Sequence, residues 1–215
     1  MTSAAKSEWS EWLIPAGLIA LSVVPVVAGA VRLVQLGSGA EITPDNVRFF
    51  AAPLPVVLHI ISVTLYCVLG AFQFVPDFRR RNPNWHRAAG RILVPSGLVV
   101  ALTGLWMTQL YPSIEYDGTT LYALRLLVGA ALILFIYRGF AAIRRRDFLH
   151  HRAWMMRSYA LAIGAGTQVL THIPWLLFPS IQGELTRTLL MGAGWAINVA
   201  VIEWILLRER RSSLS

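Results

Sequence analysis

The sequence predicts an all-α integral membrane bundle of six transmembrane helices, and three observations support this fold class. Hydrophobic residues make up 56% of the 215 residues, whereas charged residues make up only 14%. A soluble domain needs nearer a quarter of charged residues to cover its surface. The apolar residues also fall in runs of about twenty, the length that a helix needs to cross a bilayer. Unpaired backbone groups are excluded from lipid, so each run is expected to be helical.

Six such runs are the predicted spans, and they form a single transmembrane domain over residues 1–215. The spans are Leu13–Leu36, Leu54–Val75, Gly90–Tyr111, Leu121–Tyr137, Ala153–Phe178 and Thr188–Leu207. Pro53 opens the second span and Pro76 closes it. Pro15, Pro25 and Pro174 fall inside spans, where a membrane helix can absorb a kink. A transporter would more often show a repeat and broken helices near the midplane, and the sequence indicates neither.

Basic residues gather on one side of this predicted bundle, which sets its orientation. The loops after the second and fourth spans, the C-terminal tail and Lys6 together hold 15 of the 19 Lys and Arg residues. Both termini are therefore expected in the cytoplasm, with the protein in the plasma membrane and the lipid bilayer as its partner. This asymmetry explains the net charge of +8 better than nucleic-acid binding does. Glu8 and Glu11 beside Lys6 argue against a cleaved signal peptide. The remaining basic residues lie on the outer side: Arg32, Arg48, Arg125 and Arg187.

Two histidines lie at a similar predicted depth near the outer side, His59 in the second span and His172 in the fifth. Both are expected roughly 8–9 Å below the outer surface. Two histidines on different helices can hold one haem iron axially, with the porphyrin between the helices. Arg125 could pair with a haem propionate, and Met107 could replace one axial histidine. The sequence thus suggests haem b at the outer side.

Three further histidines precede spans at the inner side: His86 before the third, and His150 and His151 before the fifth. A second haem, or a zinc ion with three protein ligands and a water, could bind there. His150 and His151 point about 100° apart on a helix, so only one of them can share a given site. Helical angles would put His151 and His172 on one stripe of a continuous fifth helix.

Other polar residues inside the spans admit both a cofactor role and a structural one. Arg91 and Arg157 could contact a cofactor, or pair with Glu203 near the inner end of the last span. Gln73 and Asn198 are interpreted as structural polar groups between helices, and the histidines too could form only interhelical hydrogen bonds. Gly164 and Gly166 are interpreted as positions of close helix packing.

Four segments carry a family resemblance. They are His59 followed by L-G-A-F-Q-F (Leu69–Phe74), H-R-A-A-G-R-I-L-V (His86–Val94), H-R-A-W-M-M-R-S-Y-A-L (His151–Leu161) and W-A-I-N-V-A-V-I-E-W (Trp195–Trp204). In that order they resemble the bacterial multi-pass membrane family called domain of unknown function 2306. The resemblance implies no activity. It assigns to the family pattern His59, Gln73, His86, Arg87, Gly90, Arg91, His151, Arg152, Trp154, Met155, Arg157 and Tyr159.

Three functions remain open from the sequence. The first is a haem-binding electron-transfer protein, which only in architecture is similar to b-type di-haem transmembrane cytochromes and would exchange electrons with a quinone or a redox partner protein. The second is a non-catalytic subunit of a complex, an assembly factor or a small transporter, and the chain could also form an oligomer. The third is a zinc-dependent intramembrane hydrolase at the inner histidines, in which Glu203 would act as general base.

Overall fold

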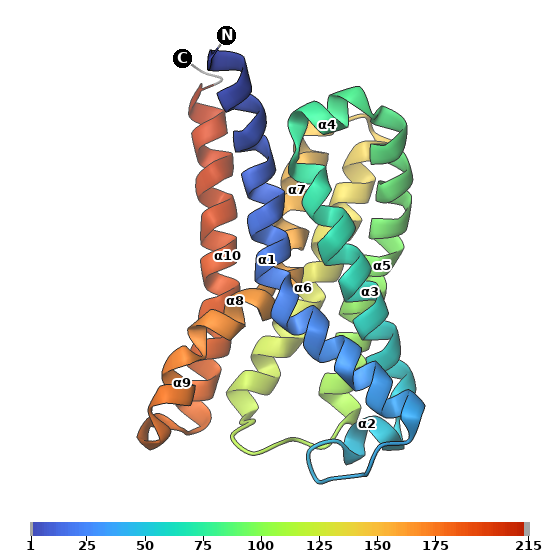
Figure 1. Cartoon of the computed structure of the whole chain (residues 1–215), viewed down its shortest axis with the longest axis vertical. Helices are drawn as coiled ribbons and strands as arrows, with labels where there is room; N and C mark the ends of the chain where they lie inside the picture. The colour runs from blue at the N-terminus through green and yellow to red at the C-terminus, as the bar shows by residue number, and fades with distance from the viewer. Residues whose placement is uncertain (1, 213–215) are drawn as a thin grey trace.

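The computed structural model describes residues 2–212, and the side chains from Trp12 to Ser212. Five of the described helices are long and apolar enough to cross a membrane: α1 (Thr2–Ser38), α3 (Pro53–Ala71, continued by the 3₁₀ turn η1), α5 (Pro83–Leu110), α6 (Thr119–Arg144) and α10 (Glu184–Ser212). Two further helices, α7 (Phe148–Ala162) and α8 (Gly164–Thr171), make a sixth span if the bent pair is counted as one. No strand occurs within the described range. The predicted all-α membrane bundle is confirmed (Figure 1).

Short elements connect these helices, and proline sets several of their starts. They are α2 (Val47–Ala51), η1 (Phe72–Phe74), α4 (Pro76–Arg81), α9 (Ile173–Leu177) and η2 (Pro179–Ile181). Pro53, Pro76 and Pro83 lie in the first turns of α3, α4 and α5, where the missing proline N–H costs no helical hydrogen bond. The third span begins at Pro83 rather than Gly90, so His86 lies inside α5 and not before it.

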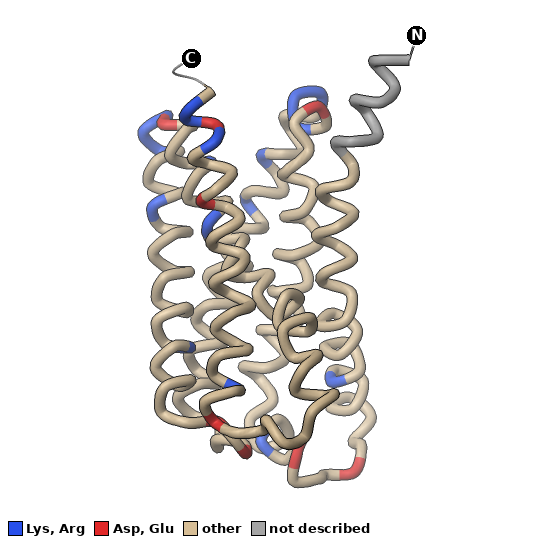
Figure 2. Tube along the Cα trace, turned by 90° about the vertical axis from the view of Figure 1, so that its left-hand side faces the viewer, with Lys and Arg blue, Asp and Glu red and all other residues tan. Residues whose placement is uncertain are grey.

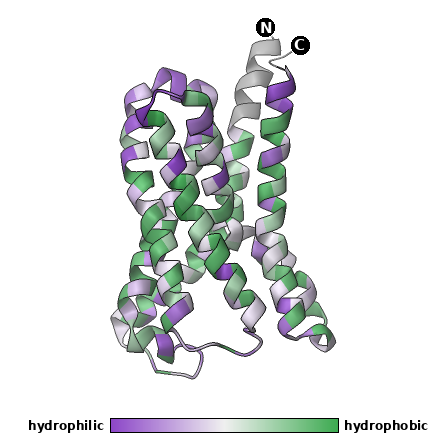
Figure 3. Ribbon diagram, turned by 180° about the vertical axis from the view of Figure 1, so that it is seen from behind, coloured by the Kyte–Doolittle hydropathy of each residue, from purple (hydrophilic) through white to green (hydrophobic). Residues whose placement is uncertain are grey.

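The two ends of the bundle differ in charge. Figure 2 shows Lys and Arg gathered at the end where α4 and the last turn of α10 lie, which we call the arginine-rich end. The other end carries the connections 39–46 and 111–118, and we call it the loop end. Hydrophobic residues predominate along the helices between the two ends (Figure 3). Assignment of the arginine-rich end to the cytoplasm stays a prediction, and the side chains of Lys6, Glu8 and Glu11 lie outside the described residues.

The expectation of one continuous helix over Ala153–Phe178 is wrong. The chain leaves the helix at Ile163, and α7 and α8 meet there at a bend of 44°. A second break at His172 separates α8 from α9, so Pro174 begins a new short helix instead of kinking an old one. Periodicity cannot reveal such a break, because the residues on both sides of Ile163 are apolar or small and suit one helix equally well.

Contacts from α10 and α1 hold the bend in place. The Asn198 side chain on α10 donates a hydrogen bond to the Ala160 carbonyl at 3.1 Å and accepts one from the Thr167 hydroxyl at 2.7 Å, so it joins α7 to α8. On the α1 side, a Cβ atom on Gly166 would lie 2.3 Å from the Leu21 carbonyl oxygen. Only glycine permits this approach of α8 to α1.

Candidate functional site

A cavity of about 540 Å³ opens at the loop end, beside the bend between α7 and α8. Helices α1, α2, α3, α5, α6, α7, α8 and α10 all contribute residues to its lining, together with the loop 111–118. Most of its wall is apolar, and includes Ile60, Val63, Val100, Val128, Leu161 and Trp195. Small-molecule sites have volumes of about 300–1,000 Å³, mostly apolar walls and a few polar groups that fix the ligand. The cavity has this character.

His59 is the histidine of this cavity, and its hydrogen bonds define its tautomer. Its Nδ1 lies 3.0 Å from the Thr103 hydroxyl oxygen. That hydroxyl donates its own proton to the Val99 carbonyl at 2.5 Å, so it accepts from His59 and Nδ1 carries the hydrogen. Nε2 then bears a lone pair. Imidazole in this state can bind a metal ion.

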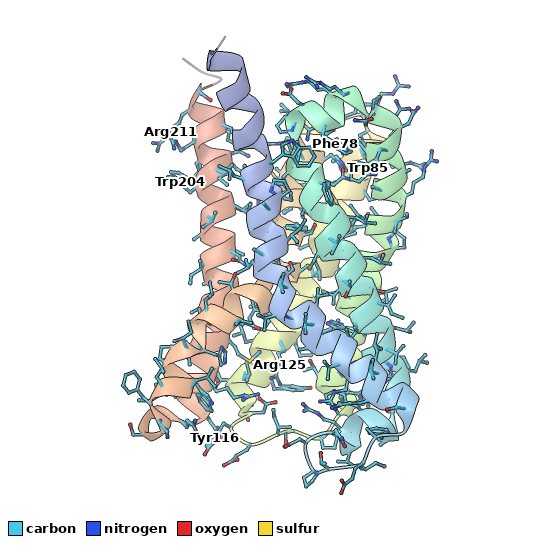
Figure 4. The ribbon with its side chains drawn as sticks, viewed as in Figure 1. Phe78, Trp85, Tyr116, Arg125, Trp204 and Arg211 are labelled. Atoms are coloured by element: carbon cyan, nitrogen blue, oxygen red, sulfur yellow. The ribbon has the colours of Figure 1, made fainter. Side chains whose placement is uncertain are left out.

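Two arginines at the loop end bind one carboxylate beside the cavity. Arg125 on α6 donates two hydrogen bonds to Asp117, at 2.7 and 3.1 Å. Arg187 on α10 donates to the same carboxylate at 2.8 Å. Asp117 belongs to the loop 111–118, and Figure 4 shows Arg125 near this loop, which also carries Tyr116. The ion pairs therefore tie the loop to two helices.

A third arginine, Arg48 on α2, also lines the cavity. Its guanidinium lies 4.7 Å from the centre of the Phe49 ring, and Arg32 approaches the same ring at 4.4 Å. The Nε atom of Arg48 is buried without a hydrogen-bond partner in the described chain. Three cavity arginines against one carboxylate, Asp117, leave a net charge of 3 − 1 = +2 in a mostly apolar site. Such an excess favours an anionic ligand.

The hydrogen bonds that hold the loop 111–118 through Asp117 depend on pH, because the Asp117 carboxyl must be ionised to accept them. Burial of the carboxyl opposes ionisation, but hydrogen bonds and charge from Arg125 and Arg187 outweigh burial, and the pKa of Asp117 lies below its ordinary value of 3.8. A carboxyl with a lowered pKa in the folded state stabilises that state above its ordinary pKa and loses this effect as the pH falls through the lowered value.

We therefore expect the loop 111–118 to stay closed from neutral pH down to about pH 5 and to open only below about pH 4. Hydrogen exchange of the loop amides, corrected for intrinsic rates, measures this. Asp117→Asn should open the loop at every pH. Glu184→Gln should not, because it changes a neighbouring carboxyl that forms no ion pair with an arginine of the described residues. Opening of the wild-type loop between pH 7 and pH 5 would show that the ionised Asp117 carboxylate does not hold the loop closed.

His172 does not share the cavity with His59. It lies at the break between α8 and α9, where its Nδ1 donates to the Gln168 carbonyl at 2.8 Å and its ring lies 6.5 Å from Trp175. His151 and His172 also do not lie on one stripe of a continuous helix, because the helix between them is broken at Ile163. Met107, the other predicted ligand of the outer site, does line the cavity.

The histidines at the arginine-rich end differ in their hydrogen bonds, although His86 and His151 lie near enough to interact electrostatically. His151 donates from Nδ1 to the Gly139 carbonyl at 2.8 Å, and the Nδ1 atom of His86 is buried without a hydrogen-bond partner in the described chain. His150 is exposed and bonds to Asp147 at 2.7 Å. Within residues 12–212, no three His, Cys, Asp or Glu side chains are grouped closely enough to hold a metal ion.

The other predicted polar residues lie on this side or between helices. Arg157 binds Glu203 through two hydrogen bonds of 2.5 and 2.8 Å, and its guanidinium lies 4.8 Å from the Trp154 ring. Arg91 is exposed on α5. The Nε2 atom of Gln73 is buried without a hydrogen-bond partner among the described residues.

Sequence reasoning missed Arg48, Arg187 and Asp117 as residues of the site. A signal for the first two was present, because Arg32, Arg48, Arg125 and Arg187 are the four basic residues on the side that carries few of them. Asp117 carried no such signal in the sequence, because carboxylates are common in connecting loops and one of them does not indicate a site. Only the fold brings it between Arg125 and Arg187.

Comparison with known proteins gives one match. The model of a family described as "Predicted membrane protein (DUF2306)" matches residues 56–206. No curated protein and no solved structure matches the chain. The matched range includes His59, Asp117, Arg125 and Arg187, whereas Arg48 precedes it.

Proposed function

Because the chain belongs to the DUF2306 family of predicted membrane proteins, whose description states no activity, we propose its function from the cavity itself. We propose that the cavity binds a membrane-soluble molecule with an apolar body and an anionic end, and that this molecule is haem b. The observation that carries the proposal is the convergence of His59 with Arg48, Arg125 and Arg187 on one apolar cavity.

The residues fit haem b in three respects. The Nε2 lone pair of His59 could bind the iron, because Nδ1–H is held by Thr103. The net charge of +2 matches two propionates, and the apolar wall suits a macrocycle. Met107 lines the same cavity, and its thioether could also bind the iron. His172 is not proposed as a ligand, since it lies outside the cavity lining.

Haem supplies one-electron chemistry when it is bound. The proposed role is therefore electron transfer within the membrane, with a quinone or a redox protein as the exchanging partner. His59 would bind the iron and tune its potential, and the excess positive charge of the cavity would balance the propionates. The apolar wall would limit the access of water.

Titration with hemin tests the proposal, because the chain offers a matched pair of histidines. His59→Ala should weaken hemin binding more than about tenfold, since it removes the ligand and leaves the cavity wall intact. His172→Ala should change it by less than about threefold, because His172 does not line the cavity. Absorbance in the Soret region reports both. Equal losses in the two variants, or no saturable binding by wild-type protein, would overturn the proposal.

A further inference from the structure

The three cavity arginines are not equivalent. The Asp117 carboxylate accepts three hydrogen bonds from Arg125 and Arg187, so those two guanidiniums already have an anionic partner. Arg48 forms no hydrogen bond or ion pair with the described residues: its guanidinium lies against the Phe49 ring, and Asp117 acts on it only through a longer-range electrostatic attraction. An unpaired cation in an apolar site is costly unless an anion joins it.

We propose that Arg48 is the specificity-determining residue of the cavity, which recognises the anionic group of the ligand. This inference rests on the proposed function and deepens it. Arg125 and Arg187 have a different task, which is to hold the loop 111–118 through Asp117. A ligand therefore binds while the loop 111–118 stays closed, because its anion pairs with the Arg48 guanidinium and does not displace Asp117 from Arg125 and Arg187.

The alternative would be exchange, in which the anion of the ligand replaces Asp117 on Arg125 and Arg187. Exchange breaks three charge-assisted hydrogen bonds before it forms new ones, and it releases the loop. Binding at Arg48 breaks none. Arg48 is also positioned by the Phe49 ring, which in turn contacts Tyr111 edge-on at 5.6 Å. Tyr111 donates to the Ala52 carbonyl at 2.6 Å, so the support of Arg48 is itself fixed.

Arg32 provides a matched control. It approaches the same Phe49 ring as Arg48 does, at 4.4 Å against 4.7 Å, but it does not line the cavity. Arg32→Gln and Arg48→Gln thus remove the same charge from two positions next to one ring. Arg187→Gln removes a cavity arginine that is already paired with Asp117.

The experiment compares hemin with its dimethyl ester, which lacks the two carboxylates but keeps the macrocycle and the iron. Arg48→Gln should weaken hemin binding about tenfold or more and leave ester binding within about threefold. Arg32→Gln should weaken both by less than about threefold. Arg187→Gln should increase hydrogen exchange of the loop 111–118, with a smaller loss of hemin affinity than Arg48→Gln. Hemin should leave the exchange of the wild-type loop unchanged or slower.

Other outcomes overturn the inference in distinguishable ways. If wild-type protein binds hemin and Arg48→Gln does not discriminate it from the ester, the inference fails and the proposed function stands. If hemin raises the exchange of the loop 111–118, the ligand displaces Asp117, and the inference fails as well. If wild-type protein does not bind hemin, the haem proposal fails. Palmitate and its methyl ester then test Arg48 with the same variants, and absence of palmitate binding also overturns the inference.

Discussion

Gly166→Ala should destabilise the bundle by about 2 kcal/mol, because there is no free space for the added methyl group. Its Cβ would lie 2.3 Å from the Leu21 carbonyl oxygen and 3.0 Å from the carbonyl carbon, both backbone atoms of α1. Neither atom can rotate away as the tip of a side chain can. Relief requires that α8 and α1 separate, which loosens the packing along their whole contact.

Gly17→Ala is the control for this prediction, since Gly17 lies on the same α1 helix and a Cβ there meets no atom within 4 Å. It should leave stability unchanged or slightly higher, because alanine favours helix more than glycine does. The thermal stability of the two variants is compared in detergent, with size-exclusion chromatography used to measure the fraction of protein that remains folded after heating. A Gly166→Ala variant as stable as wild type would show that α1 and α8 do not approach each other as described.

Arg157→Ala should cost about 3 kcal/mol, because it leaves the Glu203 carboxylate without its partner inside a span. The pair joins α7 to α10 through two hydrogen bonds, and the side chains of Arg157 and Glu203 are 18% and 39% exposed. Removing both partners should cost less than removing Arg157 alone, since no unpaired charge then remains. The double variant Arg157→Ala/Glu203→Ala measures this coupling by thermal unfolding.

The same two helices carry a second pair that serves as its control. Arg152 and Glu209 also join α7 to α10, but their side chains are 40% and 45% exposed. Arg152→Ala should cost less than about 1 kcal/mol, because exposed ion pairs contribute little. Equal losses from Arg152→Ala and Arg157→Ala would contradict the view that depth in the membrane makes the Arg157–Glu203 pair important.

The transmembrane architecture could be predicted from the sequence because it depends on local quantities. Run length, hydrophobicity and arginine placement are read one segment at a time, and lipid leaves helices as the only solution for each segment. The break at Ile163 could not be predicted in this way. It depends on Asn198, Leu21 and Trp195, which lie on other helices and provide the hydrogen bonds and close contacts around the bend.

The candidate site shows the same limit. His59, Met107 and Arg125 were expected on the outer side from depth alone, and all three line the cavity. Equal depth also favoured His172, but depth does not specify the direction in which a side chain points. The break at Ile163 and the turn at His172 change that direction. Asp117, the carboxylate that pairs with Arg125 and Arg187, could be identified only from the fold, which places its loop against α6 and α10.

The central claim is that His59 holds haem b in the cavity at the loop end. The most direct test is a dithionite-reduced minus oxidised visible spectrum of the protein purified without added haem, with metal analysis of the same sample. The claim predicts a sharp Soret band and α-band with about one haem per chain, lost in His59→Ala and kept in His172→Ala. A flat spectrum from folded protein without iron would contradict it.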